Sequence, residues 1–223
     1  MKNKIFVFLF FWLTTGSLFA QNIAQIDSLT VEMCKSLSMA TDKNNKEKIE
    51  FVFQKHIPEY FEKIQVSTQT EADSISDRVF FRLQKNCNYF SDLLETLEEN
   101  KSDWKVLDTK PSSKITQKDY KDFSRGGSYY YKEHNGTIVN VEIKGKKWSE
   151  TFHDGTFSKL TLIHKENGEF DLKFIESNNG TRKNLSVKDD IYQYGIYEKT
   201  GDVYLIWAKT ADNRLYGFKL YKK

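Results

Sequence analysis

The sequence predicts an α+β protein in which a helical domain precedes an antiparallel β domain. Apolar residues recur at helical spacing from residue 23 to about residue 100, and beyond residue 124 short β-branched and aromatic runs alternate with turn residues. The 223-residue chain has only two prolines, so regular elements and short turns must account for most of its length. We divide it into a signal peptide (1–20), a helical domain (21–100), a connector (101–123) and a β domain (124–223).

The first twenty residues have the composition of a signal peptide. Lys2 and Lys4 precede an apolar run from Ile5 to Leu13, and small and polar residues then lead to Ala20. This pattern is typical of a secretory leader, whereas the apolar run is far shorter than the roughly 20 residues that cross a bilayer. We expect cleavage near Ala20 and a secreted or periplasmic mature protein without a transmembrane segment.

Three helices are expected in the helical domain. The first is marked by apolar residues on one stripe: Ile26, Leu29, Met33, Leu37 and Ala40. Residues 48–64 predict the second, which Pro58 should kink or restart. Thr70 and Asp73 are spaced as a capping pair at the start of the third. Its stripe is expected to run unbroken through Ile75, Val79, Leu83, Cys87, Phe90, Leu94 and Leu97.

The only two cysteines are expected to form a disulfide. Cys34 lies at the edge of the first helical stripe and Cys87 lies on the third, so both side chains face inward. Export would place them in an oxidising compartment, where an even number of cysteines usually pairs. A zinc site or a cysteine nucleophile would need further partners, and only His56 lies near either cysteine in the sequence. We therefore predict a structural disulfide.

The connector and the β domain are expected to contain one short helical segment and about eight strands. The helical segment lies at 115–123, and a loop is expected at 177–184. Asn-Gly or Asp-Gly pairs separate several strands, which is a strong hairpin signal. The expected strands are 129–133, 137–143, 148–152, 157–164, 169–176, 191–198, 203–209 and 214–221. Because open edges promote aggregation, we expect this meander to close as a small up-and-down barrel or to curl strongly.

Short motifs in both halves carry a resemblance to a group of exported proteins. They are Asn86-Cys87, Gly127 before a Tyr-rich strand, Glu150 after Trp148, Asp154-Gly155, Ser158-Lys159, and Gly168-Glu169-Phe170 before Leu172. The chain resembles uncharacterised secreted Bacteroidota proteins in which a helical, Cys-containing domain precedes a small antiparallel β-barrel. This resemblance implies a secreted protein and supplies no catalytic residue.

Aromatic side chains are the main indication of binding in the β domain. Tyr129, Tyr131, Trp148 and Trp207 each lie in an expected strand, and we identify them as the candidate wall of a site for a small apolar ligand at the barrel mouth. The alternative is that these rings fill the core, because a small eight-stranded barrel is only wide enough for its own side chains. The sequence leaves both interpretations open.

The sequence favours binding over catalysis. It contains no nucleophile elbow, phosphate-binding loop or zinc-binding helix motif, and we assign no catalytic residue, metal ligand or cofactor. Loss of Lys2 and Lys4 with the signal peptide lowers the net charge from +3 to +1, which argues against a nucleic-acid partner.

We predict a non-catalytic binding or envelope-accessory module whose partner is a small apolar ligand or an envelope protein. The alternative is an exported hydrolase or metal-dependent enzyme that uses histidines of the β domain, namely His134, His153 and His164. We expect all three to lie in solvated turns or at strand ends.

Overall fold

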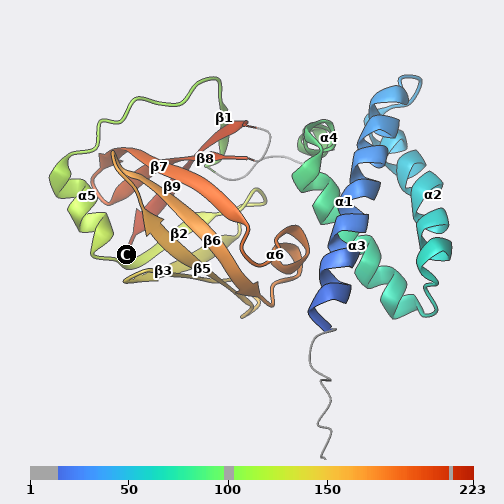
Figure 1. Cartoon of the computed structure of the whole chain (residues 1–223). Helices are drawn as coiled ribbons and strands as arrows, with labels where there is room; N and C mark the ends of the chain where they lie inside the picture. Colours follow the sequence, from blue (N-terminus) through green and yellow to red (C-terminus); the bar gives the residue numbers. More distant parts are fainter. Residues whose placement is uncertain (1–14, 98–102, 211–212) are drawn as a thin grey trace, which may run out of the picture.

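The protein consists of a helical domain beside an eight-stranded β-barrel (Figure 1). The structure is a computed structural model and describes residues 15–97, 103–210 and 213–223, with side chains from residue 23. Most of the predicted signal peptide, residues 1–14, lies outside the described residues. No helix in the described part of the chain is long and apolar enough to cross a membrane.

Four helices form the first domain: α1 (Thr15–Met39), α2 (Asn45–Ile64), α3 (Gln69–Asn86) and α4 (Asn88–Leu97). Their apolar stripes meet in one core, in which Met33, Leu37 and Val79 are fully buried. Cys34 and Cys87 form the predicted disulfide, with an S–S distance of 2.00 Å and a Cα–Cα distance of 5.6 Å. The bond ties α1 to the junction between α3 and α4.

The prediction of one unbroken third helix that opens at Thr70 is wrong in two respects, since the segment forms two helices and the first of them begins earlier. The stripe is divided at Cys87, whose extended backbone ends α3 while its carbonyl accepts the first hydrogen bond of α4, from the Ser91 N–H. Asparagines flank Cys87 on both sides, and asparagine has a low helix propensity. The helix also begins earlier than expected, because Thr68 is the N-cap and accepts a hydrogen bond from the Glu71 N–H at 3.2 Å.

Pro58 lies inside α2, and the helix continues through it as one element. A proline removes the hydrogen bond to the carbonyl four residues earlier, here that of Gln54. Both residues lie on the exposed side of α2, where water can bond to the released carbonyl. The expected restart at Pro58 is therefore wrong.

Eight antiparallel strands form a closed barrel in the order of the sequence. They are β2 (Gly127–Lys132), β3 (Ile138–Lys144), β4 (Lys147–Thr151), β5 (Phe157–His164), β6 (Glu169–Ser177), β7 (Ile191–Thr200), β8 (Val203–Lys209) and β9 (Leu215–Lys222). Pairing of Tyr129 with Lys222 and of Tyr130 with Tyr221 joins β2 to β9 and closes the sheet. The predicted fold class is confirmed, in its barrel form.

The barrel interior is filled by apolar and aromatic side chains. Along β3, for example, Val139, Val141 and Ile143 are buried and alternate with exposed residues, as expected for a strand with one face inside. Inward apolar residues from all eight strands belong to a single buried cluster.

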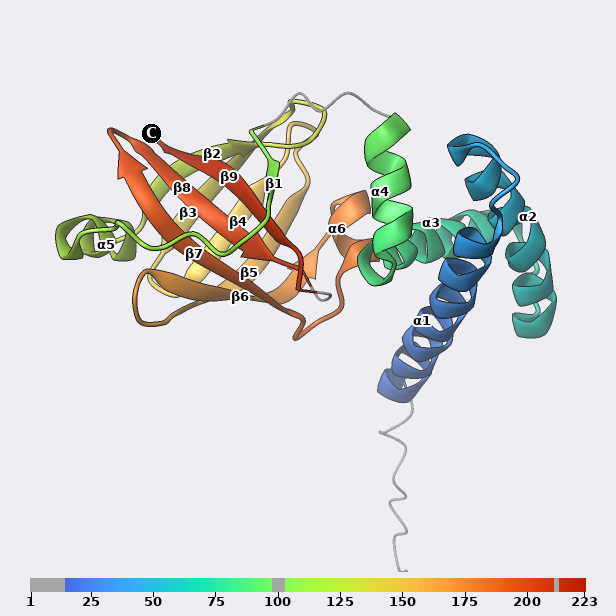
Figure 2. The ribbon, with the colours of Figure 1, turned by 90° about the horizontal axis from the view of Figure 1, so that it is seen from above.

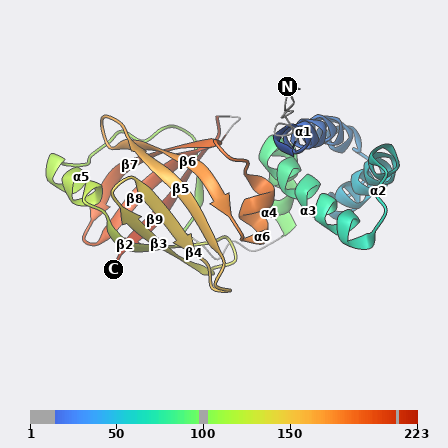
Figure 3. The ribbon, with the colours of Figure 1, turned by 60° about the horizontal axis from the view of Figure 1, so that its bottom comes forward.

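Three further elements complete the β domain. Residues 103–124 contribute a short strand, β1 (Lys105–Leu107), which pairs with β9, and a helix, α5 (Gln117–Ser124). The expected loop at 177–184 is wrong, because it contains a helix, α6 (Gly180–Leu185), which is too short for sequence periodicity to reveal. The two short helices lie at opposite ends of the barrel, and α6 lies beside the helical domain (Figure 3). We call these the α5 end and the α6 end.

Candidate functional site

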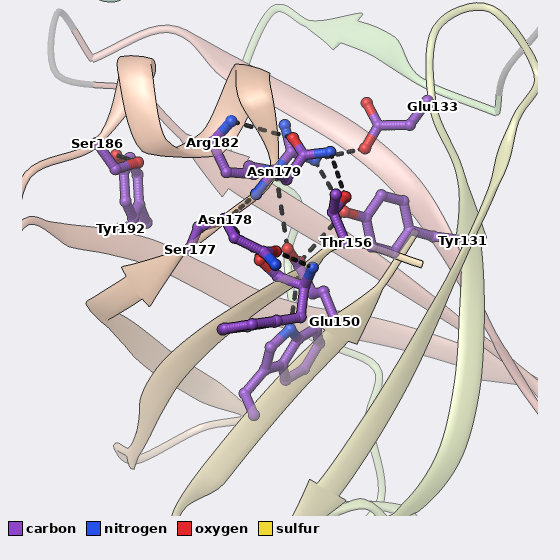
Figure 4. Close-up of polar contacts among 12 residues, drawn as sticks. Tyr131, Glu133, Glu150, Thr156, Ser177, Asn178, Asn179, Arg182, Ser186 and Tyr192 are labelled. Carbon is purple, nitrogen blue, oxygen red and sulfur yellow. Dashed lines mark hydrogen bonds and ion pairs between the residues drawn. The ribbon is translucent and has the colours of Figure 1, made fainter. Parts of the chain in front are cut away.

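Local hydrogen bonds fix α6 across the end of the barrel. Asn179 caps the helix by accepting from the Arg182 N–H at 3.2 Å, and its Nδ2 donates to Thr156 Oγ1 at 2.9 Å in the β4–β5 turn. Just before it, Asn178 Oδ1 accepts from the Phe157 N–H at 2.7 Å. These bonds join the start of α6 to the start of β5 (Figure 4).

Two basic residues on α3 hold the other end of α6, and a third holds the segment that follows it. Arg78 Nε donates to Asn184 Oδ1 at 3.1 Å, and Arg82 Nη1 donates to the Leu185 carbonyl at 3.0 Å. Lys85 pairs with Asp190, just before β7. Arg82 also binds both oxygens of Asp27 on α1, at 2.7 and 2.6 Å, so the helical domain and the barrel share one ionic network.

From α6, the side chain of Arg182 reaches into the barrel end. Its guanidinium donates to Tyr131 Oη at 3.0 Å, pairs with Glu133, and lies 3.7 Å from Glu150 Oε2 (Figure 4). The same group lies 5.4 Å from the ring centroid of Phe152. The single guanidinium of Arg182 is therefore shared between the carboxylates of Glu133 and Glu150.

Glu150 is a carboxylate in the barrel interior, with only 8% of its surface exposed. It accepts hydrogen bonds from Tyr131 Oη at 3.2 Å and from Trp148 Nε1 at 3.3 Å. Burial raises the pKa of Glu150 above its ordinary value, although Arg182 opposes the shift. On β5, Ser158 is paired with Glu150, and its Oγ is buried with no hydrogen-bond partner among the described residues. Glu150 is therefore set to take up a proton more readily than an exposed glutamate.

A pocket of about 310 Å³ lies between α4 and this end of the barrel. Its lining comes from both domains: Glu95, Trp104, Lys105, Val106, Glu133, His134 and Tyr216. The Trp104 ring stacks on Phe218 at a centroid distance of 4.3 Å and meets the Tyr131 ring edge-on at 6.4 Å. Glu133 and Trp104 therefore connect the pocket directly to the buried network around Glu150. We call this cavity the interdomain pocket.

The four aromatic residues of the candidate wall occupy two different places. Tyr129, Tyr131 and Trp148 lie inside the barrel, packed within the buried core. Trp207 faces outward instead, and its ring lies over Gly195, where an added Cβ would be 2.4 Å from Nε1. Lys110 covers the ring at 4.6 Å from its centroid. An outer groove of about 370 Å³ borders Trp207, but the four wall residues do not line one common surface.

The three histidines of the β domain do not converge. His153 is exposed in the β4–β5 turn at the α6 end, whereas His164 ends β5 at the α5 end, about 25 Å away at roughly 3.3 Å per residue. His134 is half-buried and lines the interdomain pocket. Within the described residues, no group of three or more potential ligands is arranged to hold a metal ion.

No protein-family model matches the chain, and no curated protein or solved structure shows significant similarity to it. The site therefore rests on its own geometry. Its central residues, Glu133, Glu150 and Arg182, were not identified from the sequence. One signal was present, because Glu150 alternates with Trp148 and Phe152 and so had to face the barrel interior. Arg182 gives no such signal, because a helix of six residues is too short for its sequence pattern to be distinguished from a loop.

Proposed function

We propose that the protein is an exported, non-catalytic binding or envelope-accessory module and that the interdomain pocket is its binding site. Export is supported by the leader-like first twenty residues together with the disulfide between Cys34 and Cys87, since such bonds persist in oxidising compartments.

The observation that carries the proposal is the pocket itself. Its volume of about 310 Å³ is at the lower end of the range for small-ligand sites, and it lies at a domain interface, where such sites are common. The rings of Trp104 and Tyr216 offer apolar contact, while Glu95 and Glu133 supply negative charge. This combination suits a small ligand with an apolar body and a positive group.

Three matched probes test the proposal by titration of the mature protein: phenethylammonium, its neutral alcohol analogue and the anion phenylacetate. We expect the cation to bind most tightly and to change the fluorescence of Trp104. Trp104→Phe should abolish the signal, and the control Trp207→Phe should keep it, because Trp207 lies on the outer wall. If none of the probes perturbs Trp104 in folded protein, the pocket is not a ligand site.

The rival function is an exported hydrolase or metal-dependent enzyme, and the presence of His134 in the pocket is the observation that favours it. Replacing His134, His153 and His164 together by Ala separates the two functions. Loss of a measurable hydrolytic activity from a folded variant would establish the enzyme, whereas in a binding module the substitutions should change only the ligand affinity, through His134 in the pocket lining.

A further inference from the structure

The strand pairing leaves one edge of β1 without a neighbouring strand. All of β9 from Leu215 to Tyr221 is paired with β8 on one side, so β1 and β2 must share its other side. The two strands pair with opposite ends of β9, since the pairs with β1 extend only to Gly217 and the pairs with β2 start at Tyr221. The second edge of β1 therefore faces the β2–β3 turn, and among the described residues no strand pairs with it.

The interdomain pocket lies in this gap. Lys105 and Val106 of β1 line it on one side and Glu133 and His134 of the β2–β3 turn on the other, with Glu95 of α4 alongside. The Val106 side chain is 55% exposed. An exposed edge strand offers backbone donors and acceptors to an extended chain, and pockets beside the edge select its side chains. Figure 2 shows β1 beside β9, close to the helical domain.

The charge of the pocket indicates which side chain it would select. Glu95 is exposed and accepts a hydrogen bond from Tyr216 Oη at 3.3 Å, while Glu133 already binds the guanidinium of Arg182. Lys105 is the only cation in the lining. The Trp104 and Tyr216 rings provide apolar surface for the aliphatic stem of a lysine or arginine.

We propose that the pocket recognises an extended segment of a partner protein, which adds as a strand to the edge of β1 and inserts a lysine or arginine side chain between Glu95 and Glu133. This inference rests on the proposed binding function and names its ligand. The backbone contributes affinity that is independent of sequence, and the two carboxylates contribute selectivity for a basic residue.

The test uses fluorescently labelled five-residue peptides and the mature protein. The parent peptide is Thr-Val-Lys-Val-Thr with blocked ends, and its charge control has glutamate in place of lysine. Two further versions carry N-methyl groups, either on both valines or on the threonines and the lysine. In a strand, alternate N–H groups face the same neighbour, so only one N-methyl set can block pairing with β1.

We expect the lysine peptide to bind at least about ten-fold more tightly than the glutamate peptide. One N-methyl set should weaken binding by about ten-fold or more, while the other set leaves it unchanged. Binding should also slow amide hydrogen exchange in Lys105–Leu107. Glu95→Gln should weaken the lysine peptide, whereas Glu59→Gln, a matched change at an exposed position on α2, should not.

Equal effects of the two N-methyl sets, or equal affinities of the lysine and glutamate peptides, would overturn the inference. If phenethylammonium binds at Trp104 and none of the peptides does, the pocket takes a small cation and strand addition is wrong. If neither phenethylammonium nor any peptide binds to folded protein, the proposed function fails together with this inference.

Discussion

The two ends of the barrel are closed by short helices that use opposite chemistry. At the α5 end, Phe123 inserts a fully buried ring among Tyr129, Phe170 and Tyr204, at centroid distances between 5.3 and 6.1 Å. At the α6 end, the inserted side chain is Arg182, which contacts Tyr131 and two carboxylates. The side chain that enters the barrel is therefore apolar at the α5 end and charged at the α6 end.

Each end of the barrel also has a hydrogen-bonded carboxylate, Asp122 at the α5 end and Glu150 at the α6 end, and their pKa values are shifted in opposite directions. Asp122, on α5, accepts from Lys222 Nζ at 2.8 and 2.7 Å and from Tyr204 Oη at 2.6 Å, and Lys199 lies 3.4 Å away. The hydrogen bonds from Lys222 and Tyr204 hold the pKa of Asp122 well below its ordinary value. Burial instead raises the pKa of Glu150, and the negative charge of Glu133 adds to this shift, while Arg182, which also pairs with Glu133, opposes it. The comparison teaches that the proton affinity of a carboxylate in this barrel depends on how many cations contact it and on its access to water.

The largest expected effect is at the apolar end. Phe123→Ala should lower the free energy of unfolding by about 4 kcal/mol, because it removes a fully buried ring and leaves a cavity. Urea unfolding monitored by circular dichroism measures the loss, which should be nearly independent of pH. A loss below about 1 kcal/mol would mean that α5 does not close the barrel.

At the ionic end, Arg182→Met should lower the free energy of unfolding by about 3 kcal/mol at neutral pH, because Glu150 is left buried without its cation. The double variant Arg182→Met with Glu150→Gln should recover most of this loss. A double-mutant cycle in urea measures the coupling. Purely additive losses would show that the two side chains do not act as a pair.

Acid should act in opposite directions at the two ends. The pKa of Glu150 is raised above its unfolded value of 4.5, so its favourable contribution is complete below that value and is lost as pH rises through the folded pKa. The pKa of Asp122 is lowered below 3.8, so its contribution is present above 3.8 and is lost as pH falls towards the folded pKa.

Unfolding free energies of the parent protein, Glu150→Gln and Asp122→Asn, measured from about pH 3 to pH 8, check these signs. Relative to each variant, the parent should gain stability on acidification through Glu150 and lose about 1 kcal/mol through Asp122, which is partly solvated. Parallel pH profiles for all three proteins would contradict the comparison.

The smallest expected effect concerns a single cation at the α5 end. Lys222→Met should lower the free energy of unfolding by only about 0.5 kcal/mol, since Asp122 keeps Lys199 and Tyr204 and is partly exposed. Thermal unfolding of Lys222→Met and of Arg182→Met, each compared with the parent protein, measures the difference between the two losses. Similar losses in the two variants would remove the distinction between the two ends.

The periodicities of the sequence were sufficient to predict the two architectures and the disulfide. Period-two alternation, as along β3, and the apolar stripes of the helices follow directly from burial on one face. For the sheet, the sequence leaves two forms, a closed barrel or a strong curl, because a long meander must protect its edges. The helix break at Cys87 escaped prediction, because the apolar spacing continues across it and only backbone geometry distinguishes the two helices.

The candidate site was less accessible to sequence reasoning. Trp207 has the same strand setting and aromatic character as Trp148, yet the two side chains lie on opposite faces of the barrel wall. Both alternating sets of β8 contain apolar residues, Tyr204 and Ile206 on the inner face and Leu205 and Trp207 on the outer face, so the alternation alone does not show which face is inside. The interdomain pocket depends on the docking of two domains, which no local pattern encodes.

The pairing of β1 with β9 has a consequence for the order of folding. Lys105 and Gly217 are separated by about 110 residues, so β1 gains its partner only after the chain has closed a very large loop. Contacts of such separation are slow to form, and the last strand of the chain is the one that β1 requires. Until they meet, the edge of β9 is open to the same pairing with another molecule. Completion of this seam is therefore a late step of folding, and it moves the open edge from β9 to β1.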